Sequence, residues 1–242
     1  GIVSAIYGSI MAVFLTSDTP AFPHPENANP DGLLAIGGKL DIQWLVTAYE
    51  QGIFPWFDDE NPILWWSPNP RIVLFPQDFK LNKSLRRVIQ QQKFEVRFDS
   101  CFSQVIENCA ISPRQDNPGT WITSEVKRAY TDLHEFGIAH SVEVFDKDKL
   151  VGGLYGVSLG KAFFGESMFF LQRDASKLAL YYLCQELSRW GFHFIDAQVE
   201  TSHLMSLGAV KMERSHFLQI LETATNHPTC LGKWTKTIQH EF

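Results

Sequence analysis

The chain contains 242 residues, of which 45% are hydrophobic and 20% are charged. These values exclude a disordered chain, and the length predicts one or two domains. The formal net charge of −6 excludes a protein that coats nucleic acid over its whole surface, because lysine and arginine provide the affinity for phosphate. No apolar stretch reaches the roughly 18 uncharged residues that a membrane-spanning helix needs, which disfavours an integral membrane protein.

The cysteines and the first residues bear on the cellular compartment. The cysteines lack the Cys-x-x-Cys spacing of a metal site and lie at Cys101, Cys109, Cys184 and Cys230. So few cysteines in a chain of this length do not form a disulfide framework, and we therefore expect a reducing cytoplasm. Residues 1–10 precede Met11 and lack the basic start of a signal peptide, so we interpret them as an added leader and Met11 as the native start.

In the first third of the chain, prolines mark loops around one helix. The prolines between residues 20 and 30 exclude regular structure there. A helix is expected between Asp41, a good N-cap, and Gly52, a good stop. Prolines and tryptophans then alternate up to residue 70, and we place the boundary between an N-terminal domain, 1–69, and a second domain, 70–242, at this cluster.

Two amphipathic helices are expected next. Apolar residues at helical spacing between residues 81 and 89 leave a basic opposite face, formed by Lys80, Lys83, Arg86 and Arg87. Such a face is either a plain solvated surface or a surface that binds phosphates. The second helix is expected to begin after Thr123 and to end at Gly137.

Beyond residue 140 the hydrophobic period changes from that of helices to that of strands. We expect strands at 141–145, 150–158, 161–170 and 192–199, and helices at 174–191, capped by Asp174, and at 201–207. This order predicts an α+β fold, in which a small N-terminal α+β domain precedes a mixed sheet flanked by helices.

Two short strand segments each carry a carboxylate in an apolar setting. Side chains two apart share a face of a strand, so Glu166 is expected beside Met168, and Asp196 beside Gln198. A carboxylate among phenylalanines is costly to bury unless it has a partner or a cationic ligand. These positions therefore indicate either a reactive site or a pair of satisfied structural carboxylates.

Several other segments match known motifs only in part. Gly156 to Gly160 matches the Gly-x-Ser-x-Gly nucleophile elbow, but a strand and not a helix is expected after it, so a hairpin turn explains both glycines. Gly32 to Lys39 departs from a phosphate-binding loop, because Leu40 stands where a magnesium-binding hydroxyl is needed. The histidines form no metal-binding group. Tryptophans in turn-rich segments either fill the core or stack on bases: Trp56, Trp65, Trp66 and Trp121.

The order of strands and helices from residue 141 onward resembles the acyltransferase core of the GNAT fold. In that fold a glycine-rich turn at a helix start holds the pyrophosphate of coenzyme A. Residues 172–177 contain no glycine, and Asp174 would repel phosphate. Acyl transfer from a donor other than coenzyme A is therefore favoured.

The chain also resembles the leucyl/phenylalanyl-tRNA–protein transferases. The resemblance covers residues 22 to about 217, and its motifs are Asp-Gly-Leu-Leu-Ala-Ile-Gly-Gly from residue 31, Gly-Ile-Phe-Pro-Trp-Phe from 52, Leu-Trp-Trp-Ser-Pro from 64, Gly-Thr-Trp-Ile-Thr from 119, Gly-Glu-Ser-Met-Phe from 165 and Ile-Asp-Ala-Gln from 195. Six motifs in consistent order are more specific than any single pattern above.

This resemblance implies an enzyme that moves Leu or Phe, and Met less well, from aminoacyl-tRNA to the N-terminal Arg or Lys of proteins, which marks them for degradation. It implies no coenzyme A and no metal, and a monomer is expected. The residues implied at the terminal adenosine of the tRNA are Trp56, Trp121, Tyr130 and Met168. An aliphatic pocket for the transferred side chain would contain Leu154, Leu180, Leu183 and Ile195. The basic helix around Lys83 would hold the acceptor stem.

The resemblance also implies that the side chains of Glu166, Asp196 and Gln198 face the reacting atoms. Our hypothesis for the chemistry gives each of them a role. Asp196 would orient Gln198, whose amide oxygen accepts a hydrogen from the attacking amine. Glu166 would help to hold the ester adenosine or the incoming cation. Two alternatives stay open at this point: a small-molecule N-acyltransferase that uses coenzyme A, and a non-catalytic binder of single-stranded RNA.

Overall fold

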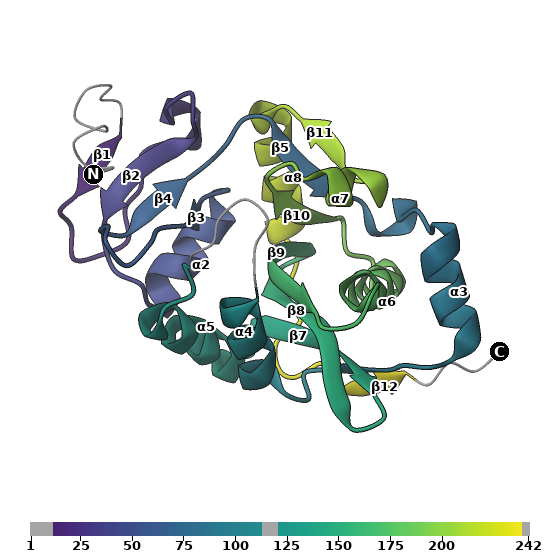
Figure 1. Cartoon of the computed structure of the whole chain (residues 1–242). Coiled ribbons are helices and arrows are strands. Elements are labelled where there is room, and N and C mark those ends of the chain that lie inside the picture. Colours follow the sequence, from purple (N-terminus) through teal and green to yellow (C-terminus); the bar gives the residue numbers. More distant parts are fainter. Residues whose placement is uncertain (1–11, 113–120, 239–242) are drawn as a thin grey trace.

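The computed structural model describes residues 12–112 and 121–238 (Figure 1). The leader predicted for residues 1–10 and the start predicted at Met11 lie outside these residues. Within the described ranges, no helix is both long enough and apolar enough to cross a membrane.

The N-terminal part is built around a small sheet. Its strands run in the order β1 (Val13–Leu15), β2 (Leu33–Gly37), β4 (Leu64–Trp66) and β3 (Phe54–Pro55). Helix α2 (Ile42–Glu50) begins as predicted, because the Asp41 carboxylate accepts the backbone N–H of Trp44 at 3.0 Å. The expectation that residues 20–30 hold no regular structure was wrong in one detail. Pro25–Asn27 forms a short 3₁₀ turn, in which Pro25 occupies a position that needs no N–H.

The second part is built on a large mixed sheet. In the described residues its strands run in the order β11 (Val210–Met212), β5 (Arg71–Leu74), β10 (Phe194–Gln198), β9 (Ala162–Phe170), β8 (Lys149–Leu159), β7 (Ala139–Asp146), β6 (Glu95–Phe98) and β12 (Lys236–Ile238). Only the β9–β10 pair among these neighbours is parallel, and α6 (Ala175–Arg189) connects its two strands. This is the α+β arrangement predicted for an acyltransferase-like core.

Helices cover both faces of the large sheet (Figure 1). Helix α6 packs against β7, β8 and β9, whereas α4 (Phe102–Ile111) and α5 (Ser124–Phe136) pack on the opposite side. The predicted caps of α5 are confirmed, since Thr123 is its N-cap and Gly137 its left-handed C-cap. The remaining helices are α3 (Lys83–Gln91), α7 (Ser202–Ser206), α8 (Arg214–Thr225) and the 3₁₀ turn Pro76–Asp78.

Asp174 occupies the N-cap position of α6 but does not cap it. Its backbone φ is 67°, and its side chain makes no hydrogen bond to the first turn of the helix. Instead the carboxylate accepts the hydroxyl of Ser84 in α3 and pairs with Lys177 at 3.5 Å. The residue therefore ties α3 to the start of α6.

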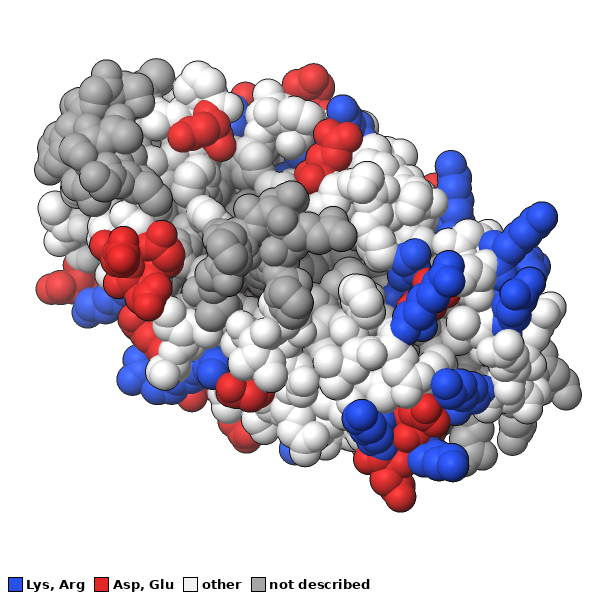
Figure 2. Space-filling view, viewed as in Figure 1, with Lys and Arg blue, Asp and Glu red and all other residues white. Residues whose placement is uncertain are grey.

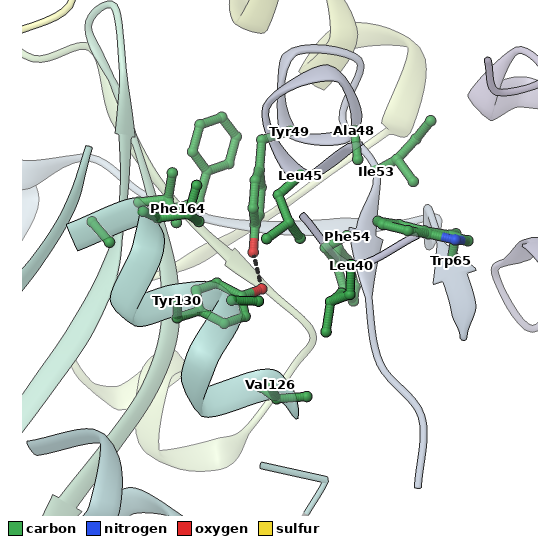
Figure 3. Packing of buried hydrophobic residues seen from close by; sticks show 14 of the residues in the cluster. Leu40, Leu45, Ala48, Tyr49, Ile53, Phe54, Trp65, Val126, Tyr130 and Phe164 are labelled. Carbon is green, nitrogen blue, oxygen red and sulfur yellow. Dashed lines mark hydrogen bonds between the residues drawn. The ribbon is translucent and has the colours of Figure 1, made fainter. Parts of the chain in front are cut away.

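Two hydrophobic clusters lie on the two faces of the large sheet. The first joins the small sheet and α2 to α4, α5 and α8, and its largest buried side chains include Tyr49, Trp65, Tyr130, Phe164 and Phe217. Figure 3 shows α2 and α5 meeting in this cluster. The second lies between the sheet, α3 and α6. The N-terminal part thus shares one core with the larger part, and the domain boundary at residue 69 stays a prediction.

Candidate active site

A chain of hydrogen bonds links the core to the ends of β9 and β10. Glu166 of β9 accepts the hydroxyl of Tyr49 from α2 and the side-chain amide Nε2 of Gln198 from β10, the latter at 3.0 Å. The hydroxyls of Tyr49 and Tyr130 are 2.5 Å apart (Figure 3). Burial, followed by the charge of Glu166, raises the pKa of Tyr49 well above its ordinary value, so this phenol stays a neutral donor. Three distant segments therefore position a half-buried carboxylate and amide.

Asp196 lies next to this pair, but its carboxylate faces inward. Its side chain is only 1% exposed, and its two oxygens accept Nε and Nη2 of Arg71 at 2.9 and 2.7 Å. One of these oxygens also accepts the backbone N–H of Gln198 at 3.0 Å. The ion pair with Arg71 holds the carboxylate of Asp196 away from solvent, and the expectation that it faces the reacting atoms stays a prediction.

The side chains of β10 do not alternate regularly between the two faces of the sheet from Asp196 to Gln198. The pairing of β10 with β5 shifts register between them, and the φ of Gln198 is 66°, in the left-handed region. A bulge of this kind re-aims one side chain. The two residues are thus connected through the backbone of Gln198 and not as neighbours on one strand face.

The two tryptophans implied at the adenosine occupy different environments. Trp56 is half-buried, and its ring meets that of Trp66 edge to face at 6.0 Å. Trp121 is 5% exposed, and its ring lies edge to face on Phe57 and Tyr130. Both tryptophans pack against the first hydrophobic cluster. No ring contact joins them within the described part of the chain, and a sandwich around an adenine stays a prediction.

The residues implied for the aliphatic pocket lie together. Their exposed fractions are 4% or less, and all belong to the second hydrophobic cluster: Leu154, Leu180, Leu183 and Ile195. Met168 packs against the same cluster and is paired with Leu154 across β8 and β9. Trp121 and Tyr130 belong to the first cluster, and the place of Met168 at the adenosine stays a prediction.

The basic residues at α3 form an exposed surface. Figure 2 shows lysine and arginine side chains gathered at the end of the molecule that carries this helix. The members predicted from the sequence are all exposed: Lys80, Lys83, Arg86 and Arg87. A cavity of about 360 Å³ lies between α3 and the start of α6, and it is lined by Ser84, Arg87, Val88, Arg173 and Asp174. From the sequence alone, Asp174 is expected to repel phosphate. In the structure Lys177 forms an ion pair with the Asp174 carboxylate and offsets part of its negative charge.

Two residues of the site escaped sequence reasoning. Tyr49 is a buried residue of α2, and Arg71 is the first residue of β5. Arg71 begins the apolar run Arg-Ile-Val-Leu, and a single cation in a buried strand is the signal that could have indicated a buried carboxylate partner. Over the described residues, no group of three or more His, Cys, Asp or Glu side chains could hold a metal ion.

Solved structures resemble the chain only weakly. The structure of L-PGS from Bacillus licheniformis has a TM-score of 0.36 and 10% identity, over 71% of this chain and 57% of that one. A GCN5-related N-acetyltransferase from Anabaena variabilis has a TM-score of 0.32 and 11% identity, over 58% of this chain and 43% of that one. TM-scores this low add nothing to the argument.

Sequence comparisons are far stronger. The family model described as leucyl/phenylalanyl-tRNA protein transferase matches residues 73–222, and the model of its N-terminal domain matches residues 38–69. A leucyl/phenylalanyl-tRNA–protein transferase of Thermodesulfovibrio yellowstonii is 50% identical over 95% of this chain and 93% of its own length. One of Aromatoleum aromaticum is 53% identical over 89% and 92%. The chain therefore belongs to the leucyl/phenylalanyl-tRNA protein transferase family.

Proposed function

We propose that this protein is a cytoplasmic aminoacyltransferase that moves Leu or Phe, and Met less well, from aminoacyl-tRNA to the N-terminal Arg or Lys of proteins. The product is a peptide bond, and the modified protein is marked for degradation. Membership of the family supports an aminoacyltransferase. The single observation that carries the reaction is the contact between Glu166 and Gln198, because it leaves a half-buried amide oxygen at the end of β10.

The orientation of the Gln198 amide follows from its partner. The side-chain Nε2 of Gln198 donates to Oε1 of Glu166, so the amide oxygen points the other way. That oxygen can accept a hydrogen from an α-amine. The amine has an ordinary pKa of about 7.7–8.0 and is already partly neutral at pH 7, so the site needs no strong base. Aligning the amine with the ester supplies up to roughly 7–11 kcal/mol.

The tRNA would bind over both clusters and the basic surface. Trp56 and Trp121 would hold the terminal adenine, while the side chain of the aminoacyl group enters the aliphatic cluster around Leu180. The exposed cations of α3 would contact phosphates of the acceptor stem. An aliphatic pocket distinguishes side chains that differ by one methylene by only roughly 1–3 kcal/mol, which explains the tolerance of Met.

The proposal is tested by single-turnover transfer from leucyl-tRNA to a peptide that begins with Arg. Replacing Gln198→Ala removes the acceptor of the amine hydrogen, and we expect the transfer rate to fall about 100-fold with the affinity for leucyl-tRNA unchanged. Gln219→Ala, on the exposed face of α8, is the matched control and should transfer at the wild-type rate. Equal loss of rate and tRNA affinity in Gln198→Ala would contradict the assigned role.

A further inference from the structure

Arg71 is an unusual buried cation at the junction of three segments. Its side chain is 1% exposed, and besides Asp196 it donates from Nη1 to the carbonyl of Gly52 at 2.9 Å and to Ser67 Oγ at 3.4 Å. Its guanidinium also lies over the ring of Phe217 in α8, 4.5 Å from the centroid. Every nitrogen of the guanidinium therefore has a polar partner, and the group has little freedom to move.

The contacts of Arg71 lead directly to Gln198. Asp196 is held by two parallel hydrogen bonds from Arg71, which fix the plane of its carboxylate. One oxygen of that carboxylate accepts the N–H of Gln198 at the point where the strand register shifts. Gln198 is not a glycine, so its φ of 66° is an uncommon conformation that needs support from its surroundings.

We propose that Arg71 is a positioning residue for aminoacyl transfer. Through Asp196 it holds the bulged backbone of Gln198, and so it aims the amide of Gln198 at Glu166 and at the attacking amine. Because Arg71 also binds Gly52 and Ser67, it fixes β10 relative to the N-terminal part, which supplies Tyr49. This inference depends on the role proposed above for Gln198, and it extends to Arg71 the expectation that Asp196 orients Gln198.

The chain offers a matched control for a merely structural role. Arg214 is also buried, at 7% exposure, and it also connects the N-terminal part to α8. It donates from Nε to Glu26 at 3.0 Å and from Nη1 to the carbonyl of Ser67 at 2.7 Å. No described contact joins it to Asp196 or Gln198. Loss of Arg214 therefore perturbs the same region without touching the support of the amide.

The test is a double-mutant cycle on Arg71 and Gln198 in the full chain. Arg71→Lys keeps the positive charge but loses the bidentate contact with Asp196, so we expect kcat to fall about 10- to 100-fold, with KM for the Arg-started peptide within about twofold. In the Gln198→Ala background, Arg71→Lys should lower kcat by less than about twofold. A residue that acts through Gln198 has no further effect once the side chain of Gln198 has been removed. Arg214→Lys should leave kcat within about twofold in both backgrounds.

The outcomes separate this inference from the proposed function. If Arg71→Lys lowers kcat by the same factor in both backgrounds, Arg71 acts independently of Gln198 and the inference is overturned, while the function stands. If the Gln198→Ala single variant transfers at the wild-type rate, the proposed role of Gln198 is contradicted, and the inference about Arg71, which depends on it, is contradicted as well. Circular dichroism and the melting temperature establish the folded fraction of each variant, and kcat is expressed per folded molecule. Wild-type kcat in folded Arg71→Lys also overturns the inference.

Discussion

Asp196, in β10, and Asp99, directly after β6, are both buried carboxylates of the same sheet, with 1% and 6% exposure, yet their partners differ. The partner of Asp196 is Arg71, whose charge is permanent, and the contact continues to the half-exposed Gln198. The partner of Asp99 is His140, at 2.7 Å, which titrates. Burial of a carboxylate therefore does not by itself mark a reactive site. In the proposed mechanism it is the connection to a partly exposed polar side chain, Gln198, that links Asp196 to the reaction.

The contacts of Asp99 end inside the protein. Its carboxylate accepts the backbone N–H groups of Ser141 and Trp234, at 2.8 and 2.7 Å. The ring of Trp234 stacks on His140 with a centroid distance of 3.5 Å. Asp99 thus fastens the segment that precedes β12 to the sheet, and we expect it to affect folding without affecting transfer.

The largest expected effect is that of Asp196→Ala. This change leaves Arg71 buried without its counter-charge, and such an orphaned ion costs about 3–5 kcal/mol of unfolding free energy. Urea unfolding at pH 7.5, followed by circular dichroism, measures the loss. A cost below about 1 kcal/mol would mean that water or another group compensates Arg71, and the contrast with Asp99 would be lost.

Asp99→Ala is expected to destabilise the fold but to spare the reaction. It leaves two buried N–H groups without acceptors, and each costs about 1–3 kcal/mol. The rate of leucyl transfer per folded molecule should equal that of the wild type, because the described contacts of Asp99 do not reach Gln198. A fall of transfer that exceeds the loss of folded protein would show that Asp99 also supports the site.

Acidification should weaken the region around Asp99 first. Burial lowers the pKa of His140, although Asp99 opposes this. Burial alone would raise the pKa of Asp99, but its hydrogen bonds from His140, Trp234 and Ser141 lower it overall. Both groups take up protons more readily when unfolded, so their contribution to stability is present at high pH. It is lost as the pH falls, first below about 6.5 for the histidine and then below about 3.9 for the aspartate.

The measurement is the melting temperature at pH 7.5 and at pH 5.5. Wild-type protein should melt at a lower temperature at pH 5.5, and His140→Gln should show a smaller difference between the two values because its side chain does not titrate. An equal difference in both proteins would place the titrating group elsewhere.

The smallest effect is expected at the basic surface. Arg86→Ala removes one exposed cation of α3, so leucyl-tRNA binding should weaken and the salt dependence, the slope of log K against log salt concentration, should fall by about 1. Arg189→Ala removes an exposed cation at the other end of α6 and should leave the slope unchanged. Equal slopes in Arg86→Ala and the wild type would remove Arg86 from the tRNA contact.

Local signals explain which parts of the fold could be predicted. Helices α2 and α5 followed from Asp41, Thr123 and Gly137, because a cap acts within a few residues. Strand β5 was missed because its pairing partners, β10 and β11, lie more than a hundred residues further along the chain. The same separation hid Arg71, which meets its carboxylate only in the folded chain. The bulge before Gln198 arises where β10 pairs with β5, so it too could not be predicted from local sequence.

The first hydrophobic cluster joins the small sheet and α2 to helices of the larger part. This shared cluster has an evolutionary consequence. Neither part covers all of its apolar surface without the other, so we expect a gene fragment that ends near residue 69 to encode a piece with exposed apolar surface. Shuffling of these two segments between unrelated proteins is thereby discouraged. Inheritance as one block preserves both the scaffold and the alignment of the tyrosine with its carboxylate.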